Sequence, residues 1–492
     1  MTIDTITTQL YINGQARQAS DGGTYPLHNP ARPSELVGHV AAGTESDVDD
    51  AVRAAHSAFP SWSALSYAER AAQLNSVADL LVGNEAEVEA RSRLFTREHG
   101  KIRRETLLEI TRLGDRFRQT AGYAERLARD ETIPGPPFDA IVTRQPRGVA
   151  VLVVPWNWPL AILGAKLPQA LMAGNTVVVK PSENAALAPT ITLHMIAAAL
   201  PPGVVNIVTG DSTRIGDRLT GHPLTRFVNF TGSVAIGRHV MKVAAENLTP
   251  VTLELGGNDP GIVLEDAVLD EAAFTRLYMG AFMSTGQICM ALKRLYVHRS
   301  RYDEVVAGIT AVANKQVVGD GLLPETTMGP LNNPKQLAVV RTMIAEARAA
   351  GADVQEFGQV PDTALYQAGY FQRPTFVLNA DPKLRVVREE QFGPVLPIMA
   401  FDTEAEVIAA ANDSEFGLCS SVWTADRDHA VALARQLEAG FTYLNAHGPA
   451  AQDGRSPFGG FKHSGIGRNM GYEGVTQFQG HHAISGPAGW LL

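Results

Sequence analysis

The sequence predicts an α/β protein with a doubly wound parallel sheet and a second α/β domain. Three observations predict this fold class. From Gly148 onward, short apolar runs alternate with segments of helical spacing, and such alternation favours parallel strands joined by right-handed crossovers. The runs are nearly continuous and rich in β-branched residues, as expected of strands covered on both faces. A second alternating series begins near Gly261.

The first series contains five expected strands and the helices between them. The strands are residues 149–154, 176–179, 204–208, 226–230 and 251–254. The helices are residues 160–172, 189–199, 214–220 and 233–247. Two earlier stretches, 46–59 and 67–99, are rich in Ala, Glu and Arg, and we expect them to form helices that cover this sheet.

The second series and the remaining segments complete the expected organisation. Expected strands are residues 261–264, 294–297 and 441–445, and expected helices are residues 271–283 and 334–350. The chain ends in an apolar tail, Ala488 to Leu492, which a monomer would leave exposed, so we expect a homodimer or homotetramer. The expected domains are residues 1–131 with 148–257, then 258–445, with 132–147 and 471–492 as oligomerisation segments.

Composition excludes several classes of protein. At 492 residues, the chain is about three times the ~150 residues of an ordinary domain. A content of 45% hydrophobic and 19% charged residues excludes a disordered chain, a collagen and a coiled coil. The chain has 42 Lys and Arg against 51 Asp and Glu, a net charge of −9, and no basic run. This balance argues against binding to nucleic acid or to an anionic membrane.

Three features bear on location. Residues 1–15 contain no Lys or Arg and no apolar core follows, so no export signal is expected. Residues 148–165 are uncharged, but Pro155, Asn157 and Pro159 in their middle favour a strand, a loop and a helix over a membrane span. The only two cysteines, Cys289 and Cys419, provide no disulfide framework, so we expect a reducing, cytoplasmic location.

Three segments carry candidate catalytic groups. Cys289 follows a glycine turn that would present its thiol on a loop; a buried, inert cysteine is the alternative. Glu254 ends an expected strand, where ligands of open α/β sheets bind, and suits a general base; a solvated carboxylate is the alternative. Asn157 lies between two prolines and two tryptophans and suits a rigid oxyanion donor; a turn asparagine is the alternative.

Two further segments favour nucleotide binding. Residues 230–233 (Phe-Thr-Gly-Ser) lead from a strand into a helix, and a helix N-terminus attracts phosphate, although the segment is not a GxGxxG fingerprint. Lys180 and Glu183 follow another strand and would suit ribose hydroxyls; a surface ion pair is the alternative.

Together these segments resemble the NAD(P)-dependent aldehyde dehydrogenase superfamily. The similarity runs from about Ala16 to Phe478. The motifs that carry it occur in family order: 155–159 (PWNWP), 177–183 (VVVKPSE), 230–237 (FTGSVAIG), 253–258 (LELGGN), 286–291 (GQICMA), 389–395 (EEQFGPV) and 457–468 (PFGGFKHSGIGR). The resemblance implies a nucleotide-binding domain, a catalytic domain and a small β oligomerisation segment.

The family pattern implies a role for each catalytic candidate. Cys289 would be the nucleophile that forms a thiohemiacetal and then a thioester, and Asn157 with the Cys289 backbone N–H would hold the oxyanion. Glu254 would activate the water that releases the acid. The expected cofactor is NAD rather than NADP, because the Glu183 carboxylate would repel a 2′-phosphate, and no metal is expected. The further cofactor contacts implied are Trp156, Lys180, Gly232, Ser233, Gly237, Leu255, Glu390 and Phe392.

The resemblance also implies a substrate tunnel. It would be lined by Trp158, Ile162, Ala165, Ile288, Met290, His447 and Phe458. Because this lining is apolar apart from His447, the expected substrate is a hydrophobic aldehyde, either aromatic, terpenoid or longer aliphatic. A semialdehyde is the alternative, with Arg455 as the cation for its carboxylate.

The sequence disfavours three other function classes and departs from the family pattern at two positions. A CoA-acylating relative is disfavoured by Glu254, which such relatives commonly lack. A non-catalytic binding protein and a cysteine hydrolase are also disfavoured, the latter because the histidine nearest in sequence to Cys289, His298, follows the next expected strand. Ser284 and Asn258 stand where many family members have Asn and Lys, and we expect these changes to affect loop packing only.

Overall fold

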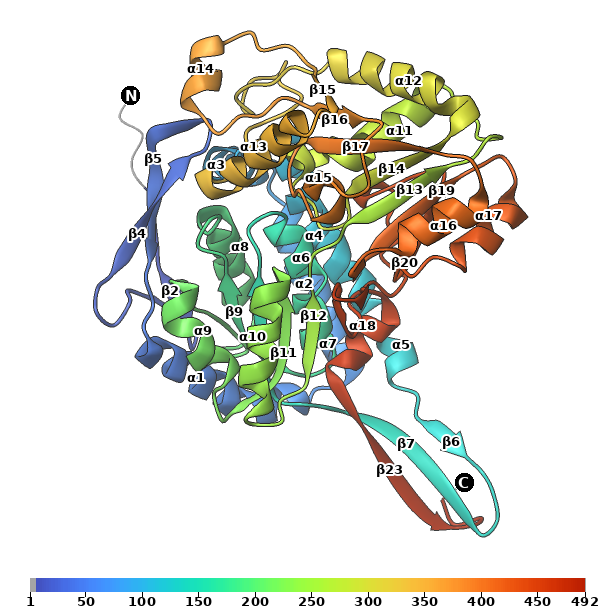
Figure 1. Ribbon diagram of the computed structural model, residues 1–492. Helices are drawn as coiled ribbons and strands as arrows, with labels where there is room; N and C mark the ends of the chain where they lie inside the picture. The colour runs from blue at the N-terminus through green and yellow to red at the C-terminus, as the bar shows by residue number, and fades with distance from the viewer. Residues whose placement is uncertain (1–5, 492) are drawn as a thin grey trace.

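Two large sheets form the centres of two layered α/β regions, as Figure 1 shows for the computed structural model, which describes residues 6–491. Three small sheets lie around them. The predicted α/β fold class with a parallel first sheet is confirmed. Within the described residues, every helix is too short or too polar to cross a bilayer. Leu492, the last residue of the predicted apolar tail, lies outside the described residues.

The first sheet has eight strands with a parallel centre. In spatial order its strands are β22 (Gly465–Ile466), β12 (Val251–Glu254), β11 (Thr225–Thr231), β8 (Val149–Val154), β9 (Thr176–Pro181), β10 (Val205–Ile207), β2 (Leu10–Ile12) and β3 (Gln15–Arg17). The five strands from β12 to β10 are parallel, whereas β22, β2 and β3 are antiparallel additions at the edges. The chain runs outward from β8 to β10 on one side and returns to β11 and β12 on the other.

Helices cover both faces of this sheet, as the apolar strands require. Alternate residues of β8 face opposite ways: Ala150 and Leu152 pack in one hydrophobic cluster, and Val149 and Val151 pack in another. The first face is covered by α2 (Tyr67–Val82), α3 (Glu85–His99), α4 (Arg103–Ala121), α6 (Pro159–Gly164), α7 (Leu167–Met172) and α8 (Leu187–Ala198). The second face is covered by α1 (Glu45–Ser63), α9 (Ser212–Thr220) and α10 (Val234–Ala245).

The second sheet has seven strands, parallel except for β15 at one edge. In spatial order they are β15 (Asp353–Glu356), β16 (Thr375–Leu378), β17 (Val395–Phe401), β14 (Leu292–His298), β13 (Asp259–Val263), β19 (Cys419–Trp423) and β20 (Phe441–Leu444). One face packs against α11 (Glu271–Phe282) and α12 (Tyr302–Asn314). The other packs against α13 (Pro334–Ala349), α15 (Arg385–Arg388), α16 (Glu404–Asn412) and α17 (Arg427–Ala434).

A three-stranded antiparallel sheet projects from the body at the lower right of Figure 1. Its strands are β23 (Gln479–Pro487), β7 (Phe138–Pro146) and β6 (Glu131–Ile133), with α5 (Ala124–Leu127) and α18 (Gly471–Gln477) at its base. The other small sheets are β1 (Ile6–Thr8), β5 (Arg32–Ala41) and β4 (Thr24–Asn29), and β18 (Phe416–Gly417) with β21 (Phe461–Lys462). The short helix α14 (Thr363–Ala368) contacts β5.

The structure differs from the expected elements at three helices. The expected helix 67–99 is two helices, because the chain breaks at Gly83 and Asn84, and the Asn84 side chain caps α3 by accepting from the Glu87 N–H. The expected helix 160–172 is also two, with the break at Ala165 and Lys166. Helix α4, which no sequence pattern singled out, packs against α2 and α6.

Candidate active site

The site lies where the chain order of the first sheet reverses. Because β8 and β11 are neighbours whose following segments diverge, a crevice opens at their carboxyl ends. Asn157 follows β8 and Ser233 follows β11. Glu254 is the last residue of β12 and pairs in register with Thr231 at the end of β11. The motifs that sequence reasoning found on separate strands therefore reach one edge of the sheet.

Cys289 reaches this crevice on a strained turn after α11. Ser284, Thr285 and Gly286 have φ values of 54°, 59° and 71°, in the left-handed region. A Cβ at Gly286 would lie 2.3 Å from the Gly393 carbonyl oxygen, so this position requires glycine. The Ser284 N–H donates to the buried carboxylate of Glu105 on α4 at 2.8 Å, which helps to hold the turn.

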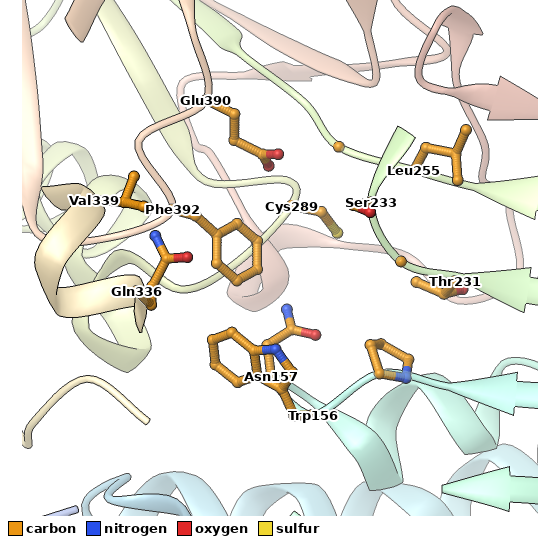
Figure 2. Close-up of a pocket in the computed structure, with 13 residues that line it drawn as sticks. Trp156, Asn157, Thr231, Ser233, Leu255, Cys289, Gln336, Val339, Glu390 and Phe392 are labelled. Carbon is orange, nitrogen blue, oxygen red and sulfur yellow. The ribbon is translucent and has the colours of Figure 1, made fainter. Parts of the chain in front are cut away.

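Two cavities meet beside Cys289. The first, of about 250 Å³ and shown in Figure 2, is lined by Pro155, Trp156, Asn157, Thr231, Gly232, Ser233, Leu255, Gly256, Cys289, Gln336, Val339, Glu390 and Phe392. The second, of about 80 Å³, is lined by Arg112, Arg116, Asn157, Trp158, Ala161, Ile162, Ala165, Thr231, Glu254, Ile288, Cys289, Met290, Pro449, Gln452, Phe458 and Met470. Asn157, Thr231 and Cys289 line both cavities, and Glu254 lines the second. The structure thus brings the three predicted catalytic side chains together.

Asn157 is buried and oriented by one hydrogen bond. Its Nδ2 donates to the Gln287 carbonyl oxygen at 3.0 Å, two residues before the cysteine. An amide NH₂ group has two donor hydrogens. One of them therefore fixes the side chain against the cysteine loop, and the other remains for an oxyanion.

Burial raises the pKa of both the Cys289 thiol and the Glu254 carboxyl group. Burial raises the pKa of Cys289 to about 12, and the negative charge of Glu254 adds to this shift. Burial also raises the pKa of Glu254, against the opposing charge of Lys166. Lys166 is fully buried, its Nζ donates to Asn229 Oδ1, and burial lowers its pKa to about 7. A carboxylate with a raised pKa is a better proton acceptor near neutral pH than an ordinary one.

Lys293, at the start of β14, is a buried cation that sequence reasoning did not find. Its Nζ donates to the Ile288 carbonyl oxygen and lies 5.8 Å from the centre of the Phe392 ring. Its charge lowers the pKa of Cys289 against the larger effect of burial. It also opposes the burial that raises the pKa of Glu390 to about 7. The only sequence signal was the charged pair Lys293 and Arg294 at the start of an expected strand.

Six of the seven predicted substrate-lining residues line the second cavity, and His447 does not. His447 is buried behind it, with Nδ1 at 2.8 Å from Ser421 Oγ and its ring against Tyr443. Arg455, the predicted cation for a semialdehyde, is 78% exposed and bound by Asp453, so it is not available to this cavity. The lining residues that sequence reasoning missed are Arg112, Arg116, Ala161, Pro449, Gln452 and Met470.

The first cavity and a further one lie on either side of the N-terminus of α10, an arrangement that fits a dinucleotide. Ser233 caps this helix by accepting from the Ile236 N–H, and the helix dipole there favours a diphosphate. A Cβ at Gly237 would lie 2.5 Å from Leu255, so glycine permits the close packing beneath it. Trp156, Glu390 and Phe392 lie in the first cavity, where Gln336 and Val339 of α13 are additional lining residues.

The further cavity contains the predicted ribose-binding lysine. It is lined by Val153, Lys180, Ser212, Thr213, Gly216, Asp217, Leu219, Thr220, Phe230, Ile236, His239 and Val240. Lys180 Nζ contacts Ser212 Oγ at 2.8 Å and Glu183 Oε2 at 3.3 Å, and Ser212 Oγ donates to the same carboxylate oxygen at 3.0 Å. Lys180 and Ser212 line the cavity, and the Glu183 carboxylate that both contact lies next to it, an arrangement of groups that suits ribose hydroxyls.

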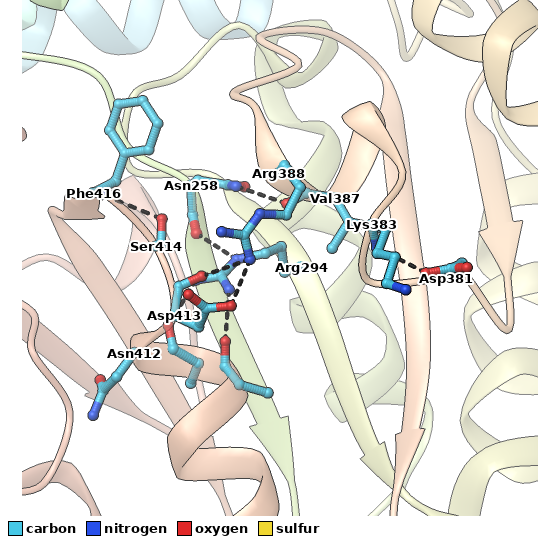
Figure 3. Close-up of polar contacts among 12 residues, drawn as sticks. Asn258, Arg294, Asp381, Lys383, Val387, Arg388, Asn412, Asp413, Ser414 and Phe416 are labelled. Atoms are coloured by element: carbon cyan, nitrogen blue, oxygen red, sulfur yellow. Dashed lines mark hydrogen bonds and ion pairs between the residues drawn. The ribbon is translucent and has the colours of Figure 1, made fainter.

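Asn258, which follows the Glu254 segment, is bonded to α15, the short helix that precedes Glu390, and Figure 3 shows its bonds. The Asn258 side-chain Nδ2 donates to the Val387 carbonyl oxygen at 2.8 Å. The main-chain carbonyl oxygen of Asn258 accepts from Arg294 Nε at 2.8 Å. Arg388 anchors the same helix through Asp413 Oδ2 at 2.7 Å. Asn258, which stands where many family members have lysine, therefore links the segment that carries Leu255 and Gly256 to the one that carries Glu390, and both segments line the first cavity.

Comparison with known proteins identifies the family. The model of the Aldehyde dehydrogenase family matches residues 17–484. The chain belongs to the aldehyde dehydrogenase family. This aldehyde dehydrogenase is 37% identical over 475 residues to glutarate-semialdehyde dehydrogenase of Pseudomonas putida, covering 96% of each chain. It is 38% identical over 459 residues to geranial dehydrogenase of Castellaniella defragrans, covering 92% of this chain and 94% of the relative.

A solved structure shows the same fold. Betaine aldehyde dehydrogenase of Staphylococcus aureus in complex with NAD+ superposes on this aldehyde dehydrogenase with a TM-score of 0.91 at 32% identity, covering 99% of this chain and 95% of that one. The resemblance found in the sequence motifs is therefore confirmed. The protein is an oxidoreductase that acts on aldehydes, and its family uses NAD or NADP.

Proposed function

We propose that this aldehyde dehydrogenase uses NAD to oxidise hydrophobic aldehydes to carboxylic acids through an adduct on Cys289. The observation that carries the proposal is the junction of the two cavities at Asn157, Thr231 and Cys289, with Glu254 beside it. One cavity suits the dinucleotide and the other, largely apolar, suits the aldehyde. The thiol thus lies between the two reactants.

Each group at the junction has a step in this reaction. Glu254 accepts the proton of Cys289 as Sγ attacks the carbonyl carbon, and the free hydrogen of the Asn157 amide with the Cys289 N–H stabilises the oxyanion. NAD, which Trp156, Ser233, Glu390 and Phe392 would hold in the first cavity, would supply the hydride acceptor that converts the adduct into a thioester on Cys289. Glu254 then releases its proton to solvent. As a carboxylate again, it removes a proton from water while the water oxygen attacks the thioester, and the C–S bond breaks to release the acid and restore the thiolate.

Hydrolysis is favoured over transfer of the acyl group to CoA because Glu254 lines the same cavity as the thioester sulfur. A buried carboxylate with a raised pKa at this position has the activation of water as its evident use. The test is the product: we expect the free acid and NADH without added CoA. A requirement for CoA would contradict the assignment.

NAD is favoured over NADP because of Glu183. Its carboxylate lies with Lys180 and Ser212 at the expected ribose site, where it accepts hydrogen bonds from hydroxyls and repels a dianionic 2′-phosphate. The Glu183→Gln substitution removes the repulsion, and we expect the NADP-to-NAD ratio of kcat/KM to rise at least about tenfold. A ratio that does not change would contradict the role of this carboxylate.

The apolar lining favours an aromatic, terpenoid or longer aliphatic aldehyde. Trp158, Ile162, Ile288 and Phe458 supply most of the apolar surface, and Ala165 leaves room between them. The names of the relatives include both a terpenoid aldehyde and a semialdehyde. A panel of aldehydes measured by NADH absorbance tests the proposal, which predicts higher kcat/KM for hydrophobic aldehydes than for succinate semialdehyde. The reverse order would overturn it.

We infer that the β23–β7–β6 sheet mediates self-association into a dimer or tetramer. Ile133, Phe138, Ile484 and Trp490 expose large apolar side chains on or next to this sheet, and β23 is an open edge. Sedimentation equilibrium should show a mass of two or four chains, and Ile484→Lys should reduce it. A wild-type monomer at micromolar concentration would contradict the inference.

A further inference from the structure

The second cavity, which we assign to the aldehyde and call the substrate-side cavity, contains two arginines that the proposed chemistry does not use. Arg112 and Arg116 lie one helical turn apart on α4, and both line this cavity with Gln452 and Pro449 from the segment after β20. None of these four residues lines the first cavity, which we assign to the cofactor. The two guanidiniums are therefore positioned to meet the substrate rather than the dinucleotide.

Most of the donor capacity of these guanidiniums is unused. Within residues 6–491, Arg112 makes one hydrogen bond, to the Pro449 carbonyl oxygen at 3.3 Å, and Arg116 makes one, to Gln119 Oε1 at 2.8 Å. Neither takes part in an ion pair among these residues, whereas Arg118, on the outer face of the same helix, pairs with Asp79 at 2.7 Å. Since a guanidinium has five N–H donors, both side chains can bind an anion without giving up a contact.

The charges around the pair do not neutralise it. The negative charge of Asp453 raises the pKa of Arg116. Both carboxylate oxygens of Asp453, however, accept hydrogen bonds from Arg455, at 3.0 and 2.8 Å. Asp115, on the same helix, is 75% exposed. Burial and the charge of Arg112 lower the pKa of Arg116. Like charges four residues apart on a helix destabilise it, and a bound anion would remove that cost.

Gln452 supplies a third donor in the same region. Its Nε2 is buried and has no partner among the described residues. A buried donor without a partner is costly and is expected to find one in the functional complex. Apolar residues, including Ile162 and Phe458, make up most of the remaining lining.

We propose that Arg112, Arg116 and Gln452 form a subsite for an anionic group, in the simplest case a carboxylate. The preferred substrate is then an aldehyde whose apolar body separates the carbonyl carbon from a terminal anion. This inference rests on the proposed function, because it assumes that the cavity receives the aldehyde. A short semialdehyde fits it poorly, since such a chain has little apolar body to fill the lining between Cys289 and the arginines.

The test compares two aldehydes that differ in one charge, 4-formylbenzoate and its methyl ester. For the wild-type enzyme with NAD, we expect kcat/KM to be about 10- to 100-fold higher for the carboxylate, the range of a charge-assisted hydrogen bond. Arg112→Gln and Arg116→Gln should each lower this ratio, mainly through the KM of the carboxylate, because the contact is made equally in the ground and transition states. Arg116→Lys, which keeps the charge, should retain part of the ratio.

The design separates the possible outcomes. Because both aldehydes are measured on one preparation, the ratio cancels any loss of folded enzyme. Arg118→Gln, a change of the same kind on the outer face of α4, should leave the ratio at its wild-type value. Equal kcat/KM for the two aldehydes, or a ratio that the Arg112 and Arg116 variants leave intact, would overturn the subsite while oxidation itself still occurs. Failure to oxidise either aromatic aldehyde would overturn the proposed function as well.

Discussion

Replacing Asn157 by alanine should slow hydride transfer by about 10²–10³-fold, a loss of about 2.7–4 kcal/mol of transition-state stabilisation. The magnitude follows from the structure, in which the Asn157 amide is buried at the junction of the two cavities and is held at 3.0 Å from the Gln287 carbonyl oxygen. Alanine removes one of the two proposed oxyanion donors and leaves the Cys289 N–H in place. It also leaves the Gln287 oxygen without this partner, which costs about 1–3 kcal/mol of stability if water does not replace it.

The assay is single-turnover formation of NADH with enzyme in excess over aldehyde, because this isolates the step in which the oxyanion forms and collapses. Circular dichroism and thermal unfolding of the variant establish the folded fraction, so that the rate refers to native enzyme. Asn157→Asp is a useful companion, since it keeps the shape but places a negative charge at the oxyanion, and its loss should exceed that of alanine. A fully folded Asn157→Ala enzyme that loses less than about tenfold would refute the oxyanion role.

Three further predictions concern the surroundings of the thiol. Lys293→Met removes the cation that lowers the pKa of Cys289, so alkylation of the thiol by iodoacetamide should require higher pH; an unchanged pH profile would contradict this. The raised pKa of Glu254 places the acidic limb of kcat above the pH range of an ordinary glutamate, and activity falls as pH falls through that pKa because the protonated base cannot accept a proton; a rate that stays constant down to pH of about 4.5 would contradict this. Gly286→Ala places a Cβ 2.3 Å from the Gly393 oxygen at a left-handed φ, so activity should be lost by displacement of the cysteine loop, and a crystal structure with the loop in place would count against it.

Much of the fold could be predicted because the central strands carry a strong signal. Strands 149–154 and 251–254 agree with β8 and β12, since a strand buried on both faces must be apolar along its whole length. Two antiparallel edge strands were not predicted, because β15 is mostly polar and β22 has only two residues. The pairing of β22 with β12 joins residues more than 200 positions apart, which no local pattern encodes.

In the candidate site, too, the residues in sequence motifs were predicted and those placed by tertiary packing were not. Glu254 ends a strand and Asn157 follows one, so the rule that ligands bind at the carboxyl ends of parallel strands places them near each other, whereas Cys289 follows a helix and its place was implied by its family motif. Arg112 and Arg116 lie on α4, a helix that was not predicted. They were missed because tertiary packing, not local sequence, decides which helix lines the second cavity. The placement of His447 in the tunnel was inferred by analogy, and in the structure His447 contacts Ser421 and does not line the cavity.

The central claim is that Cys289 becomes acylated and that Glu254 supports its release. The most direct measurement is mass spectrometry of the Glu254→Gln enzyme mixed with NAD and an aromatic aldehyde and then quenched in acid. The account predicts a burst of about one NADH per active site, followed by slow turnover, and an acyl group of the substrate's mass on the peptide that contains Cys289. Normal steady-state turnover with no acyl group on that peptide would contradict it.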